Sequence, residues 1–268
     1  MAHGNSYISI GPSFNVGKST VIEAVQDVVG ALNELKDEYI RFPETPAETA
    51  AFIETFENLS LLPNIVGAID GTHVKIAAPK NSAVDYFSRF QQHDFSIQAV
   101  ADGTLKFLDV SAGYPGSIHD SRMLRNSTLY YRAEAGHILT MPVVNVNGHD
   151  IGPYLVGDSA YPISPWLQKP FPEATRDRRE IKFNKELSSA RVKIECAFGC
   201  LKSRWRILEK RLDSEILFSV KIAIACAVLH NFCIRMGDGW EDNGPGDNDD
   251  HDENNDEDIR DILKDFIF

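Results

Sequence analysis

The chain has 268 residues, of which 43% are apolar and 25% charged, and its formal net charge is −12. This length and composition fit one large globular domain, or one domain with small appendages, and exclude a chain too polar to form a core. No apolar run reaches the roughly 18 residues that a membrane-spanning helix needs, and the N-terminal residues lack the basic-then-apolar order of a signal peptide. We therefore expect an intracellular protein that does not enter a membrane.

The four cysteines exclude two further classes of protein. Cys196 and Cys200 stand four residues apart in a predicted helix, and Cys226 and Cys233 lie in an apolar stretch. Because no CxxC pair occurs, the sequence favours neither a disulfide framework nor a zinc site.

The charges are strongly segregated along the chain. Residues 237–258 hold eleven acidic residues and no Lys or Arg, whereas residues 169–211 hold thirteen basic residues against six acidic. This distribution indicates an anionic partner on one face of the protein and a solvated acidic tail, which we expect to be disordered.

Residues 1–43 are predicted to form an N-terminal helical segment. Ser19 or Thr20 is a suitable cap for a helix whose apolar residues follow helical spacing from Ile22 to Leu35. The stretch 17–20 ends like a phosphate-binding loop, but Pro12 stands where that motif requires glycine. We favour a truncated helix-turn-helix, and a packing helix without a DNA role is equally open.

After a proline-bounded linker and a short helix over 47–58, the first strong strand is predicted from Ile65 to Ile76, with Asp70 inside it. A carboxylate in a buried strand costs several kcal/mol unless it is paired, hydrogen-bonded or metal-bound. Asp70 is therefore a candidate ligand, and the alternative is an aspartate that caps a turn at Gly71.

The next segment predicts a hairpin and a helix. Phe95 to Ala101 and Leu105 to Ser111 are strands joined by the turn signal at Asp102. Ser117 is expected to cap a helix that runs through Leu124 and Leu129, with Asp120 in its first turn. The adjacency of His119 and Asp120 is a weak signal of a metal site, because an aspartate at a helix start is usually electrostatic.

A second acid follows a second strand. After a hairpin predicted over 143–148, the strand Tyr154–Val156 is followed directly by Gly157 and Asp158. The carboxyl end of a strand is where α/β sheets usually carry ligand groups. Asp158 is a candidate ligand on this ground, and an exposed turn aspartate is the alternative.

A third acid lies in a long helix. Residues 169–189 are predicted to be a basic loop, and the helix becomes clear from Ala190 through an apolar stripe that begins at Ile194. Glu195 borders this stripe among basic residues, so it is either a ligand or half of an ion pair with Arg191. A second apolar helix is expected over 219–234, with His230 as a core residue, and an amphipathic segment over 259–268 is expected to dock on the body or on a partner.

Four motifs read in order resemble one family. They are Ala68–His73, Pro115–Arg122, Gly157–Pro162 and Arg191–Lys202, and together they resemble the PIF/Harbinger superfamily of DDE transposases and the nucleases derived from it. The resemblance covers about residues 6–231. It implies an α/β fold with an RNase H-like core, a mixed sheet flanked by helices, over residues 64–236.

The resemblance also implies an activity and a site. It implies a divalent-metal-dependent DNA endonuclease that hydrolyses, and in some members transfers, phosphodiesters. Asp70, Asp158 and Glu195 would hold two Mg²⁺ or Mn²⁺ ions, with Asp120 as a fourth ligand or a supporting residue. The residues expected to contact the DNA backbone are Arg191, Lys193, Lys202, Arg204 and Arg206.

The implied partners are DNA and a separately encoded Myb-like DNA-binding protein, with a homodimer left open. The implied location is the nucleus, with the cytoplasm as a second location. The rival interpretation is a catalytically silent, domesticated protein that associates with DNA or chromatin as an interaction module.

Overall fold

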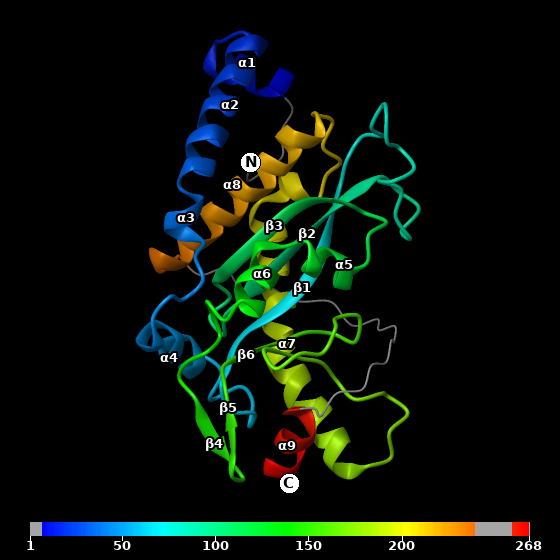
Figure 1. Ribbon diagram of the computed structural model, residues 1–268. Coiled ribbons are helices and arrows are strands. Elements are labelled where there is room, and N and C mark those ends of the chain that lie inside the picture. The colour runs from blue at the N-terminus through cyan, green and yellow to red at the C-terminus, as the bar shows by residue number, and fades with distance from the viewer. Residues whose placement is uncertain (1–6, 239–258, 268) are drawn as a thin grey trace.

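A five-stranded mixed sheet forms the centre of the computed structural model, which describes residues 7–238 and 259–267 (Figure 1). Its strand order is β3-β2-β1-β6-β7. Strands β1, β2 and β3 pair antiparallel, whereas β6 joins β1 in parallel and β7 joins β6 in parallel. The strands are β1 (Ile65–Lys75), β2 (Asp94–Ala101), β3 (Phe107–Pro115), β6 (Tyr154–Val156) and β7 (Leu167–Gln168).

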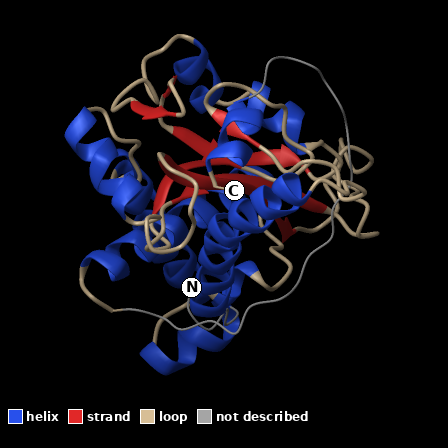
Figure 2. Ribbon diagram, turned by 90° about the horizontal axis from the view of Figure 1, so that it is seen from below, coloured by secondary structure: helices blue, strands red, loops and turns tan. Residues whose placement is uncertain are grey.

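Helices cover both faces of this sheet, so the strands lie in the interior (Figure 2). On one face, α7 (Arg178–Arg204) and α8 (Ile216–Arg235) share a large apolar core with β1 and β2, centred on residues such as Ile97 and Ile194. On the other face, α5 (Asp120–Arg125) and α6 (Thr128–Glu134) pack on Ile69. This mixed sheet between helices is the predicted α/β architecture, and it is consistent with an RNase H-like fold.

The N-terminal residues are helical, as their periodicity predicted. They form α1 (Tyr7–Phe14), α2 (Lys18–Glu34) and α3 (Lys36–Tyr39), and α4 (Pro46–Glu54) follows. Helix α2 lies along α8, and the Asn33 amide donates to the Lys221 carbonyl at 2.9 Å. A helix rather than a strand precedes the turn at Gly17, which agrees with rejecting a phosphate-binding loop. The division into domains stays a prediction.

The segment predicted as a basic loop over 169–189 is half helix, so that prediction was wrong. Helix α7 begins at Arg178 instead of Ala190, because the Asp177 side chain accepts a hydrogen bond from the Arg179 backbone N–H at 2.8 Å and caps it. Phe183 and Leu187 are buried about three and two turns before Ile194, where the predicted stripe begins. The many charged residues of this segment lie on the exposed side of α7, and in the sequence they outnumber the few apolar residues of the stripe.

The helix predicted from Ser117 is also different. It begins at Asp120 with His119 as its N-cap residue, and it is interrupted after Arg125. The Ser117 hydroxyl donates to the Asp85 carbonyl instead, and Ser127 caps the next helix through the Tyr130 N–H.

The hairpin expected over 143–148 is confirmed as β4 (Val144–Val146) and β5 (His149–Ile151). Helix α8 is long and apolar enough, by length and composition, to cross a bilayer, but half of that stretch is buried inside the protein. It is a core helix, as expected, and the buried His230 ring bonds the Leu105 carbonyl at 2.8 Å.

The C-terminal amphipathic segment docks on the body. It forms α9 (Ile259–Phe266), which lies against α7 and buries Leu263 completely (Figure 1). Most of the predicted acidic tail, residues 239–258, lies outside the described residues. Asp238, at its start, pairs with Arg204 at 2.9 Å.

Candidate active site

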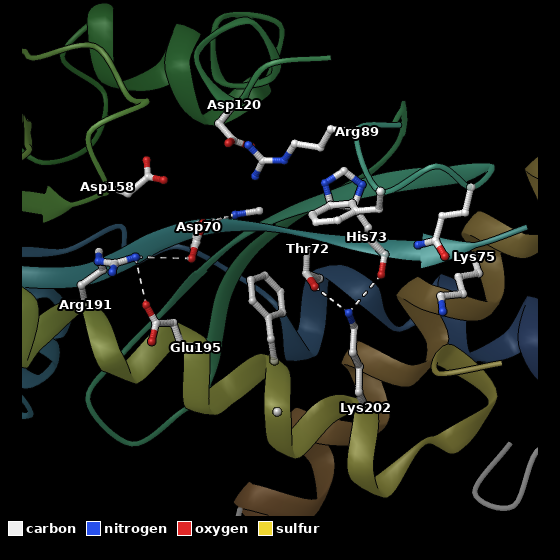
Figure 3. A pocket seen from close by; sticks show the side chains of 15 residues that line it. Asp70, Thr72, His73, Lys75, Arg89, Asp120, Asp158, Arg191, Glu195 and Lys202 are labelled. Carbon is white, nitrogen blue, oxygen red and sulfur yellow. Dashed lines mark hydrogen bonds and ion pairs between the residues drawn. The ribbon is translucent and has the colours of Figure 1, made fainter. Parts of the chain in front are cut away.

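The candidate site lies where strand β6 stops short of its neighbour. Strand β6 pairs with β1 as far as Ala68, whereas β1 continues to Lys75 along β2. A cavity of about 490 Å³ opens along this part of β1, between α7 on one side and α5 on the other (Figure 3). Its lining includes all four acids singled out from the sequence, Asp70, Asp120, Asp158 and Glu195, which we call the acidic end.

Asp70 stands on β1 at the centre of the acidic end. Its Oδ1 accepts a hydrogen bond from the Gly71 N–H at 2.6 Å, and its Oδ2 lies 3.8 Å from Arg191 Nη1. Burial, and next the negative charge of Asp158, raise the pKa of Asp70 to about 8. A carboxyl group that resists ionisation in this way is stabilised by a cation placed between it and the neighbouring acids.

Asp158 and Asp120 approach Asp70 from the other side of β1 (Figure 3). Asp158 follows β6 by two residues, and its Oδ1 accepts from the Ala160 N–H at 3.1 Å. Asp120 is the first residue of α5, and it fits against β1 because Gly71 has no side chain: a Cβ there would lie 2.6 Å from Asp120 Oδ1. Burial raises the pKa of Asp120, and the charges of His73 and Arg89 oppose this effect.

Glu195 reaches the cavity from α7 but is held by Arg191. Arg191 Nη1 lies 2.9 Å from Glu195 Oε1, one turn along the helix, and the Arg191 residue is 9% exposed. The guanidinium therefore sits between Glu195 and Asp70 and serves as the cation of this site (Figure 3). The ion pair of Glu195 with Arg191 that the helical spacing indicated is therefore present, and the role of Glu195 as a metal ligand stays a prediction.

The donor set fits a hard divalent cation in its chemistry. It consists of carboxylate oxygens, which Mg²⁺ and Mn²⁺ prefer, without cysteine. As they stand, however, no three His, Cys, Asp or Glu side chains within residues 7–238 and 259–267 are grouped closely enough to hold an ion. Glu195 is paired with Arg191 in this arrangement.

The far end of the same cavity is basic, and the sequence did not predict its composition. We call His73, Lys75, Arg89 and Lys202 the basic end, and from it the Arg89 side chain extends toward Asp120 of the acidic end (Figure 3). Lys202 Nζ donates to Thr72 Oγ1 at 2.7 Å and to the His73 carbonyl at 3.0 Å, and burial lowers its pKa to about 8. His73 is part of the Asp70 motif, but nothing in its spacing indicated a partner 21 residues away.

That partner of His73 is Asp94, whose carboxylate is fully buried. Asp94 Oδ1 lies 2.9 Å from His73 Nδ1, while Oδ2 accepts from the Ser88 hydroxyl at 2.7 Å and the Gln92 amide at 3.2 Å. Gly116 makes room for this group, because a Cβ there would lie 1.7 Å from Asp94 Oδ1. The glycine of the second motif thus has a packing reason that its sequence context did not reveal.

Of the five residues predicted to contact DNA, two line the cavity. Arg191 and Lys202 line the cavity, whereas Arg204 pairs with Asp238 and lines a separate pocket beside His230. Lys193 and Arg206 are outside the cavity lining. Arg206 lies beyond α7, which ends at Arg204, and it begins the 3₁₀ turn Arg206–Leu208. Their contact with DNA stays a prediction.

Comparison with known proteins gives one consistent result. The family model of the DDE superfamily endonuclease matches residues 69–231. The protein named "Antagonist of like heterochromatin protein 1" of Arabidopsis thaliana is 32% identical over 91% of this chain and 62% of its own length. The human protein named "putative nuclease HARBI1" is 30% identical over 88% of this chain and 65% of its own length. No solved structure matches.

The matched region contains all four motifs apart from Ala68, the first residue of the first motif. It begins within β1 and ends within α8. The chain covers less than two thirds of the length of these relatives. The chain therefore belongs to the DDE superfamily endonucleases, among the harbinger transposase-derived proteins.

Proposed function

We propose that this chain is a divalent-metal-dependent DNA endonuclease in which Asp70, Asp158 and Glu195 are the catalytic acids. The observation that carries the proposal is their convergence: three acids from β1, from the end of β6 and from α7 line one cavity. The pKa of Asp70, raised by burial and by Asp158, supports it further. Carboxyl groups whose pKa is raised by burial and by a neighbouring negative charge are typical of functional sites.

The roles of the residues follow from their positions. When bound, two Mg²⁺ or Mn²⁺ ions would supply an activated water and would stabilise the leaving 3′ oxygen. Asp70, which lies between the other acids, would hold both ions, and Asp158 and Glu195 would each hold one. Asp120 would support Asp70 from α5, as a fourth ligand or through ordered water. The proposal includes transfer of the cut strand as a second activity of the same site.

The test is plasmid nicking with Mg²⁺, compared with a chelator. We expect Asp158→Asn to lower nicking to the chelator background without loss of folding. Asp150→Asn is the matched control, because Asp150 is exposed on the β4–β5 hairpin, away from the cavity, and its side chain accepts a hydrogen bond from Asn145. Nicking by Asp158→Asn at the wild-type rate would remove Asp158 from the mechanism.

A second candidate function is a catalytically silent protein associated with DNA or chromatin. The ion pair of Arg191 with Glu195 favours it, because a guanidinium there can replace the ions permanently. The name of the Arabidopsis relative, which refers to a heterochromatin protein, points the same way.

Calorimetry with Mn²⁺ separates the two functions. The nuclease requires that Glu195→Gln binds the ion more weakly than the wild type, while Glu173→Gln, at an exposed position of the surface, binds it equally. Equal binding by wild type and Glu195→Gln favours the silent protein.

Under either function we propose a nuclear protein that is also present in the cytoplasm. We propose that it acts with DNA and a Myb-like partner and is able to form a homodimer.

A further inference from the structure

The metal chemistry proposed for the acidic end gives no role to Phe90, an aromatic residue that lies beside the basic end of the cavity. Phe90 belongs to the loop of residues 77–93, which connects β1 to β2, and it lines the cavity with 53% of its surface exposed. Its ring meets the His73 ring edge-on at 5.0 Å between centroids, and the Arg89 guanidinium carbon lies 5.3 Å from its centroid. Single exposed aromatic residues are common on protein surfaces, and Phe90 differs from the others in that it lines the cavity of the candidate site.

The position of Phe90 is fixed by buried polar groups. The Phe90 N–H donates to Ser88 Oγ at 3.3 Å, and the Ser88 hydroxyl donates to the buried Asp94 carboxylate at 2.7 Å. The same carboxylate holds His73, against which the ring rests. One buried side chain, Asp94, thus fixes both the loop and the imidazole through its hydrogen bonds.

We propose that Phe90, Arg89 and His73 form a subsite for one unpaired nucleotide of the DNA, next to the phosphodiester to be cut. This inference rests on the proposed function and names the form of its substrate. The base would stack on Phe90, because stacking on an aromatic side chain needs no particular base. The phosphate would lie against Arg89 and the rest of the basic end, which is continuous with the acidic end in one cavity.

The nucleotide must be unpaired because of the geometry of duplex DNA. Inside a duplex both faces of each base are covered by its neighbours, so a base reaches a protein ring only at a strand end, in single-stranded DNA or after leaving the stack. The subsite therefore predicts a preference for DNA with an overhang over fully paired DNA.

The same loop provides a matched control. Phe87 is also a phenylalanine, is 47% exposed and contacts His93 at 5.3 Å between centroids, but it is not part of the cavity lining. A comparison of Phe90→Ala with Phe87→Ala separates a subsite from the general effect of removing an exposed aromatic side chain from this loop.

The experiment measures fluorescence anisotropy of two labelled duplexes with equal paired length, one blunt and one with a short overhang. It uses the full chain in a chelator, so that no ion and no cleavage contribute. We expect the wild type to prefer the overhang, and Phe90→Ala to lose about tenfold in affinity for it, the order expected for one lost stack. Phe90→Trp should retain the preference, and Phe87→Ala should leave it unchanged.

Arg89→Gln should weaken binding of both duplexes and reduce the salt dependence by about one counterion. The subsite is overturned if the wild type binds both duplexes equally or binds neither, or if Phe90→Ala and Phe87→Ala have the same effect. A chain that nicks plasmid yet gives one of these results retains the nuclease function and loses the subsite. A chain that cannot nick but shows the Phe90-dependent preference retains the subsite and loses the nuclease function.

Discussion

At the scale of single residues, Arg191 is the group that decides the state of the candidate site. It is almost fully buried and reaches two of the proposed catalytic acids, Glu195 at 2.9 Å and Asp70 at 3.8 Å. Without another cation, this guanidinium compensates carboxylates that would otherwise repel one another in a partly buried cavity. It also competes with any ion that requires Glu195.

We therefore predict opposite effects of Arg191→Met with and without a divalent cation. In a chelator the variant should be less stable by about 1–3 kcal/mol, because buried acids lose their counter-charge. Mn²⁺ should raise its melting temperature by more than it raises that of the wild type, since the ion no longer competes with Arg191. Thermal denaturation with and without Mn²⁺ checks both effects, and an equal shift in the two proteins would contradict the prediction.

The raised pKa of Asp70 predicts how stability depends on pH. The unfolded Asp70 loses its proton near its ordinary pKa of 3.8, whereas the folded residue keeps it until about pH 8. Between these values the folded state binds more protons, so the contribution of Asp70 to the free energy of unfolding falls as pH rises.

Asp70→Asn removes this dependence. In a chelator, the variant should gain stability relative to the wild type as pH rises from 4 to 8, with the largest difference near pH 8. Urea denaturation at pH 5 and pH 8 measures it. A constant difference between the two proteins across this range would show that Asp70 ionises normally.

At the scale of elements, α7 connects the site to the C-terminal end of the chain. Its middle carries Arg191 and Glu195, and its first turns support α9, where Arg179 pairs with Asp265 at 2.8 Å. Leu263 is fully buried in this contact, whereas Phe266 of the same helix is 45% exposed. Helix α9 thus stabilises the part of α7 that the sequence did not predict to be helical.

Leu263→Ala should lower the free energy of unfolding by about 2 kcal/mol, at the low end for a buried leucine, because a terminal helix can undock instead of leaving a cavity. Phe266→Ala should change it by less than about 0.5 kcal/mol, as expected for a surface position. Denaturant titration measures both values. If the two variants were equally stable, α9 would contribute nothing through Leu263.

At the scale of the whole molecule, the net negative charge of the chain repels DNA, its proposed substrate. The cavity has a basic end, but the chain carries a net charge of −12, and residues 239–258 hold ten of its 39 acidic residues. Long-range repulsion between this acidic segment and DNA is screened by salt.

Replacement of these ten acids by their amides removes one charge each and brings the formal net charge from −12 to −2. We expect the variant to bind duplex DNA more tightly at 20 mM salt and equally at 500 mM salt, since screening removes the difference. Anisotropy titrations across this range check the expectation. A gain that persists at high salt would indicate a direct effect on the binding site.

The sequence by itself predicted the main elements and the candidate acids. The strand around Asp70, the strand before Asp158 and the helix of Glu195 are all present, because burial along one element produces a period that the sequence displays directly. The four motifs identified the family, since order and spacing are also properties of the chain alone.

The tertiary structure alone decided how these elements meet. Strand β6 ends at Val156 and leaves β1 open, Arg191 of α7 lies 3.8 Å from Asp70 of β1, and Asp94 joins His73 to the loop of Phe90. None of these follows from periodicity, because which side chains become neighbours depends on sheet order and packing between distant segments. The position of each acid along its element, and the ion pair of Glu195 with Arg191 one helical turn away, were therefore predictable, whereas partners on other elements and the raised pKa of Asp70 were not.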